Sequence, residues 1–182
     1  AASGEPLLVE HFDADVPDNS PVGGVPGWHV LALANGMPVD FTDTARNGLY
    51  PSLSHSFAGA GTYGPGYLVM GSGTVVSNVL AWMECPTNLD QRAISSIQFY
   101  TRNDFPDAME RVVVRIDKRW YASAQIFRDP STNGGWNLNT LAFTTNANAW
   151  RLLNTNTLML GAELGSPLPK GEISAIGFFG QS

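Results

Sequence analysis

The stretch Glu110-Arg-Val-Val-Val-Arg-Ile-Asp-Lys-Arg-Trp-Tyr-Ala-Ser-Ala-Gln-Ile-Phe127 predicts a β-hairpin. Every second residue from Val112 to Ile116 is aliphatic, which is the period-2 pattern of a strand with one buried face. Asp117-Lys118 fits a tight two-residue turn, although the glycine that is usual in such turns is missing. A return strand then begins near Trp120.

The polar residues of this hairpin predict a candidate ligand-binding sheet face. Aromatic, arginine and glutamine side chains on the polar face of a sheet are typical of sugar-binding surfaces. An ordinary solvated face has the same composition, so both interpretations stay open. The residues that we expect to share this face are Arg111, Arg115, Tyr121 and Gln125.

Composition limits the partners of this chain. Its 182 residues suffice for one domain with a full core, so we expect a single domain over 1–182. The formal net charge of −6 disfavours nucleic acid and anionic membranes as main partners, because both attract basic surfaces. No apolar run approaches the length of a membrane span. Neutral ligands, or ions held by carboxylates, remain open.

Short strand-like segments with turn residues between them predict an all-β fold. The content of 19 Gly and 12 Pro, with only 14% charged residues, is consistent with many turns. No segment of helical length keeps an apolar stripe with a period of 3.6 residues. We therefore expect a two-sheet antiparallel jelly-roll sandwich. The expected strands are residues 7–12, 28–33, 38–42, 67–70, 75–85, 94–101, 111–116, 120–127, 139–144, 151–153, 157–161 and 172–179.

The chain resembles the concanavalin A-like or laminin-G-like β-sandwiches of bacterial carbohydrate-binding modules. The resemblance rests on Glu10-His-Phe-Asp13 at the start, Gly27-Trp28 before the next strand, the hairpin at 111–127 and the closing strand at 173–179. These are patterns of strands and turns that span most of the chain. The resemblance implies glycan binding and, as in many such domains, a structural calcium ion.

Two loops supply further candidates. Tyr63 lies in a glycine-rich loop and Trp136 follows Asn133-Gly-Gly135, so both are poorly placed for a core and could stack on sugar rings. The loop Asp13-Ala-Asp-Val-Pro-Asp18 clusters carboxylates, which are calcium ligands. Its spacing differs from that of an EF-hand, and turn formation alone also explains it. The candidate calcium ligands are Asp13, Asp15 and Asp18.

The single cysteine, Cys85, excludes an intrachain disulfide, and we expect a buried structural thiol there. The chain starts at Ala1 without an initiator methionine, which fits a mature exported protein or an excised piece. We expect a monomer that is secreted or displayed at the cell surface.

The missing catalytic signatures favour a binding protein over an enzyme. Glycosidases need two carboxyl groups that flank the bond, and no paired-glutamate strand motif occurs. The sequence therefore predicts a non-catalytic carbohydrate-binding module whose partner is a polysaccharide or oligosaccharide. Two alternatives stay open: a polysaccharide-degrading hydrolase or lyase that uses Glu84, Glu110 or the arginine pair, and a structural or adhesive domain that contacts protein.

Overall fold

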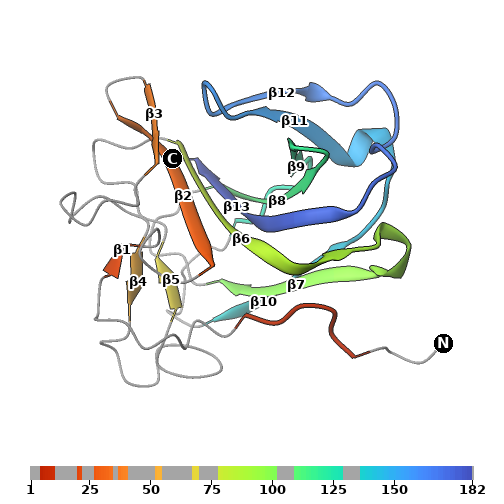
Figure 1. Ribbon diagram of the computed structural model, residues 1–182, viewed down its shortest axis with the longest axis horizontal. Helices are drawn as coiled ribbons and strands as arrows, with labels where there is room; N and C mark the ends of the chain where they lie inside the picture. The colour runs from red at the N-terminus through yellow and green to blue at the C-terminus, as the bar shows by residue number, and fades with distance from the viewer. Residues whose placement is uncertain are drawn as a thin grey trace.

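The computed structural model describes residues 5–10, 20–21, 27–34, 37–40, 52–54, 67–69, 78–101, 109–128 and 136–181, and these contain strands and two 3₁₀ turns but no α-helix. The all-β prediction is confirmed (Figure 1). The elements are β1 (Ser20–Pro21), β2 (Trp28–Ala34), β3 (Met37–Asp40), β4 (Ser52–Ser54), β5 (Tyr67–Val69), β6 (Asn78–Leu89), η3 (Gln91–Ala93), β7 (Ser96–Thr101), β8 (Met109–Ile116), β9 (Arg119–Ser123), β10 (Asn137–Ala142), η4 (Ala147–Ala149), β11 (Trp150–Asn154), β12 (Met159–Glu163) and β13 (Ile173–Gln181).

Within the described residues, eight strands form one large antiparallel sheet in the order β12-β11-β9-β8-β13-β6-β2-β3. Strand β13 lies between β6 and β8 and pairs with both. The other strands form two smaller sheets, a β7–β10 pair and a β1-β4-β5 sheet.

The central hairpin is present as the sequence predicts. Strand β8 pairs with β9 from Ile116 and Arg119 at the turn to Val113 and Ala122. Asp117 and Lys118 have positive φ angles of 49° and 66°, which is the conformation of a type I′ turn. This turn matches the twist of the flanking strands, and here it forms without glycine.

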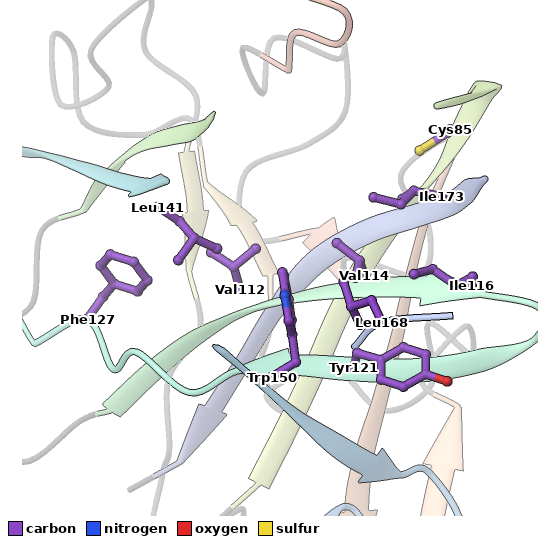
Figure 2. Packing of buried hydrophobic residues seen from close by; sticks show 10 residues of the cluster. All are labelled: Cys85, Val112, Val114, Ile116, Tyr121, Phe127, Leu141, Trp150, Leu168 and Ile173. Carbon is purple, nitrogen blue, oxygen red and sulfur yellow. The ribbon is translucent and has the colours of Figure 1, made fainter. Parts of the chain in front are cut away.

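One face of the large sheet is buried beneath the β7–β10 sheet, and we call it the covered face. Phe99 of β7 packs its ring against Phe127 and Phe178, with centroids 4.9 and 5.0 Å apart. Cys85 is buried in the same core as a free thiol, which confirms the expectation for this residue. Figure 2 shows the ten buried side chains of this core, which are Cys85, Val112, Val114, Ile116, Tyr121, Phe127, Leu141, Trp150, Leu168 and Ile173.

The opposite face of the large sheet is enclosed by the sheet's own curvature, and we call it the concave face. The β11–β12 hairpin folds back over β6 and β13 (Figure 1). At the tip of this hairpin, the backbone carbonyl of Leu158 accepts a 2.8 Å hydrogen bond from the side-chain amide of Asn78, at the start of β6. The second hydrophobic core fills this face with Leu80, Val113, Trp120, Ala122, Leu153, Leu158, Ala175 and Phe179.

Most of the expected strands are present, but the first is not. Residues 7–10 of the expected strand 7–12 have no strand conformation, and residues 11–12 lie outside the described residues. Leu8 nevertheless packs against the core of the covered face. None of the helical segments described is long and apolar enough to cross a membrane.

Candidate functional site

The structure separates the residues expected on one polar face. In the β8–β9 ladder Arg115 lies opposite Trp120, whereas Tyr121 lies opposite Val114. Because directly opposed residues share a sheet face, Arg115 is on the concave face and Tyr121 is on the covered face. Tyr121 is only 3% exposed and belongs to the hydrophobic core there. The prediction that Tyr121 shares a face with the arginines is therefore wrong.

The remaining predicted site residues are dispersed. Arg111 is on the concave face but is only 8% exposed. Gln125 is exposed and follows the end of β9, and Trp136 is half-buried just before β10. Tyr63 and the acidic loop with Asp13, Asp15 and Asp18 lie outside the described residues. Over the ranges that are described, no group of three or more His, Cys, Asp or Glu residues is arranged to hold a metal ion.

Around Arg115 the concave face carries a group of aromatic and charged side chains, which we call the Trp–Arg cluster. It consists of His29 on β2, Trp82 and Glu84 on β6, Arg115 on β8 and Trp120 on β9. The sheet order places these strands next to or near one another, so residues far apart in sequence converge.

The aromatic members of the cluster are in ring contact. The rings of His29 and Trp82 stack with centroids 5.3 Å apart and an interplanar angle of 22°. Trp120 meets Trp82 edge-on, with centroids 5.1 Å apart and an angle of 66°. Trp120 is buried, whereas His29 and Trp82 are partly exposed. The cluster therefore combines one buried aromatic ring, that of Trp120, with two rings that solvent can reach, those of His29 and Trp82.

Arg115 is held in one orientation by its neighbours. Its two terminal nitrogens donate to the two carboxylate oxygens of Glu84, with Nη1 at 2.9 Å from Oε1 and Nη2 in contact with Oε2. Its Nε donates to the hydroxyl of Ser174 at 2.9 Å. The guanidinium carbon lies 5.5 Å from the centre of the Trp120 ring, within range of a cation–π interaction. A forked ion pair with these extra contacts is preorganised.

An irregularity in β13 brings Ser174 to this position. The register with both neighbouring strands shifts between Ile173 and Ala175. Against β8 the shift places one extra residue on β13, and such a bulge redirects a side chain. Here it lets Ser174 reach Arg115 while Ile173 and Ala175 remain fully buried.

Gly177 allows close packing of strands beneath the cluster. It lies opposite Trp82 on one side and Val113 on the other. A Cβ atom at this position would come within 2.0 Å of the Ala81 carbonyl oxygen and 2.6 Å of the Trp82 Cα. Only glycine therefore permits this approach of β13 to β6, which sets the position of Trp82.

The ion pair governs the charge state of Glu84. The hydrogen bonds from Arg115 lower the pKa of Glu84, and they outweigh burial, which acts to raise it. The Glu84 side chain is 44% exposed and that of Arg115 is 22% exposed, so the pair is accessible from solvent. Glu84 is therefore ionised at neutral pH, with lone pairs available to an incoming donor.

The sequence indicated part of this cluster. Arg115 was expected in a binding face, and Glu84 was a candidate in the enzyme alternative. Their contact was not foreseen, nor were the roles of His29, Trp82 and Ser174. The alternation in β6 does place Trp82 and Glu84 on one face, but only the insertion of β13 brings that face next to Arg115.

Comparisons with protein-family models, with curated proteins and with solved structures find no match to this chain.

Proposed function

We propose that this protein is a non-catalytic carbohydrate-binding module that recognises a polysaccharide or oligosaccharide on the concave face, at the Trp–Arg cluster. The observation that carries the proposal is the accessible His29–Trp82 stack beside the fixed Glu84–Arg115 pair. Sugar rings present C–H groups that pack on aromatic surfaces and hydroxyls that bond to charged and polar groups.

The rigidity of the cluster supports a binding role. Long charged side chains normally lose rotamer freedom when they bind a ligand, which weakens binding. Arg115 already lies in one orientation between Glu84, Ser174 and Trp120, so little additional ordering is needed. Glu84 can accept from sugar hydroxyls, and the unused donor positions of Arg115 can donate to them.

The charge state of Glu84 favours binding over hydrolysis. A glycosidase needs one protonated and one ionised carboxyl group on either side of the bond. Glu84 is kept ionised by Arg115, so it does not offer the protonated carboxyl group that such an enzyme needs as its general acid.

We further propose that the large sheet and the β7–β10 sheet belong to a jelly-roll sandwich. The contacts of Phe99 with Phe127 and Phe178 join the two sheets, as in a sandwich core. The same proposal includes a monomer that is secreted or cell-surface, and a structural calcium ion held by Asp13, Asp15 and Asp18. The acidic composition and the clustered carboxylates support these points.

The decisive test is a panel of polysaccharides in affinity gels and tryptophan-fluorescence titrations, run with and without a calcium chelator. Trp82→Leu should weaken binding about tenfold or more, because it removes the aromatic ring and keeps apolar volume. Tyr100→Leu, in the small sheet, is the matched control and should bind as the unchanged protein does. Circular dichroism establishes that each variant is folded.

Three outcomes would overturn the proposal. Equal affinity of Trp82→Leu and the unchanged protein would exclude the cluster as the site. Release of reducing ends or unsaturated sugars from any polysaccharide would show an enzyme. If the folded protein binds no glycan, the structural or adhesive alternative is favoured.

A further inference from the structure

Two further arginines, Arg111 and Arg151, lie on the concave face outside the Trp–Arg cluster. Arg111 of β8 is in register with Phe179, which belongs to the core of that face. Arg151 of β11 is in register with Ala122, which belongs to the same core. The positive charge of Arg151 is close enough to lower the pKa of Arg111, after the larger effect of burial.

Among the residues that the structure describes, each guanidinium is anchored through one terminal nitrogen. Nη1 of Arg111 donates to the carbonyls of Ser123 and Ala124, at 2.8 and 3.0 Å. Nη1 of Arg151 donates to the carbonyl of Gly161 at 3.1 Å. These contacts fix the two side chains. They leave the Nε and Nη2 donors of each guanidinium unpaired among the described residues.

The Nε atoms of both arginines are buried, and no residue in the described part of the chain accepts a hydrogen bond from them. Glu163 lies opposite Arg151 in the β11–β12 ladder, yet the described ion pairs include neither of these arginines. Burial of like charges without a counter-ion is unfavourable. The Nε–Nη2 edge of arginine is a two-donor fork that matches the two oxygens of a carboxylate or the oxygens of a sulfate.

We propose that Arg111 and Arg151 bind an oxyanion of an acidic glycan, either the carboxylate of a uronic acid or a sulfate ester. The anion would reach Arg111 past Arg151, which is the more exposed of the two. It would supply acceptors to the unpaired guanidinium donors and neutralise the two positive charges. The glycan part of this inference rests on the proposed function; the anion part rests on the arginine pair alone.

The test uses three oligosaccharide classes of matched length in isothermal titration calorimetry: an oligogalacturonate, a sulfated glucan and a neutral glucan. Free galacturonate and inorganic sulfate are titrated separately. The variant is Arg151→Gln, which removes the charge and the fork from the more accessible partner. Arg119→Gln is the matched control, because Arg119 is exposed at the start of β9. Thermal unfolding verifies that both variants fold.

We expect the oligogalacturonate or the sulfated glucan to bind more tightly than the neutral glucan, with an affinity that falls as salt rises. Arg151→Gln should lower this affinity about tenfold to a hundredfold, while Arg119→Gln changes it little. Whichever of the two acidic oligosaccharides binds more tightly shows whether the site prefers a carboxylate or a sulfate. Arg151→Lys should recover only part of the loss, because lysine keeps the charge and lacks the fork.

The results separate this inference from the proposed function. Tight binding of the neutral glucan, with no preference for either acidic class, would leave the module intact and overturn the anion site. Equal losses in Arg151→Gln and Arg119→Gln would also overturn it. Binding of free galacturonate or sulfate that requires Arg151, with no glycan binding, would support the anion site and reject the carbohydrate module.

Discussion

At the scale of single residues, Arg115 joins the buried and exposed parts of the concave face. Its guanidinium rests on the buried ring of Trp120 and pairs with the half-exposed carboxylate of Glu84. The ion pair therefore contributes both to stability and to the chemistry offered to a ligand.

Glu84→Gln tests the contribution of this pair to stability. Arg115 lowers the pKa of Glu84 below its usual 4.5, so the folded state binds the Glu84 proton more weakly than the unfolded state. The resulting stabilisation is fully present above pH 4.5 and disappears as the pH falls through the lower folded-state pKa. Urea unfolding across this range should show a deficit of Glu84→Gln at neutral pH that shrinks in acid.

Glu163→Gln is the control for that experiment, because Glu163 is exposed at the end of β12. A deficit of Glu84→Gln that stays constant from neutral to acid pH would reject an ionic contribution. Solvent exposure of Glu84 keeps the expected effect small, on the order of 1 kcal/mol or less.

Residue identities alone predicted part of the candidate site. Arg115 and Glu84 are chemically conspicuous, since charged residues are few in this chain. They are 31 positions apart, and their strands are separated in the sheet by β13, so no local pattern could pair them. The contact depends on a long-range strand insertion that sequence periodicity does not encode.

At the scale of elements, the β8–β9 hairpin forms with two non-glycine residues at positive φ. Lys118 has a φ of 66°, where a Cβ atom is unfavourable and glycine is not. The alternation of the strands and the interstrand contacts evidently offset this local cost. The turn is therefore the least favourable backbone conformation in the hairpin, whose two strands are well specified by their sequence pattern.

Lys118→Gly should therefore stabilise the protein by about 0.5–1 kcal/mol, the usual gain from glycine at a left-handed turn position. Chemical denaturation of the two proteins measures the difference. Lys118→Ala is the matched control, because it also removes the lysine but keeps a Cβ atom, and it should give no such gain. A larger gain from alanine than from glycine would contradict the explanation.

The hairpin also shows why the sequence misplaced Tyr121. Val112, Val113 and Val114 are all fully buried, so β8 has two buried faces. Alternation of polar and apolar residues assigns faces only where one side of a sheet is solvated. With both faces buried, only the cross-strand register, Arg115 to Trp120 and Val114 to Tyr121, determines which side each residue occupies.

At the scale of the whole molecule, the core of the covered face depends on strands from most of the described chain. Cys85 is buried there between residues of β6, β8 and β13. Burial also raises the pKa of its thiol, so little thiolate exists at neutral pH. Cys85 is therefore a natural reporter of the integrity of this core.

A thiol reagent should react slowly with Cys85 in the native protein, and the rate should rise with urea as the core opens. Absorbance of the released chromophore follows the reaction. The control is Met159→Cys in a Cys85→Ser background, because position 159 is 62% exposed. That thiol should react rapidly without urea. Rapid native labelling of Cys85 would show that the covered face opens locally.

The all-β class and most strands were predictable, whereas the order of the strands was not. Turn residues and alternation are local signals, and they located β2, β6, β8, β9 and β13 within a few residues. Sheet order depends on pairings between distant segments. Residues 7–10 also show that an apolar segment can pack through Leu8 on the core without joining a ladder.

The position of β13 has a consequence for how the chain folds. The half of the large sheet with β2, β3 and β6 and the half with β8, β9, β11 and β12 meet through β13. Until that strand is synthesised, β6 and β8 each retain an open edge of unpaired backbone groups. Open edges recruit strands from other molecules, and pairings this distant in sequence form slowly. The concave face and its two candidate sites therefore assemble only once β13 is available, and the facing edges of β6 and β8 are open to unwanted pairing until then.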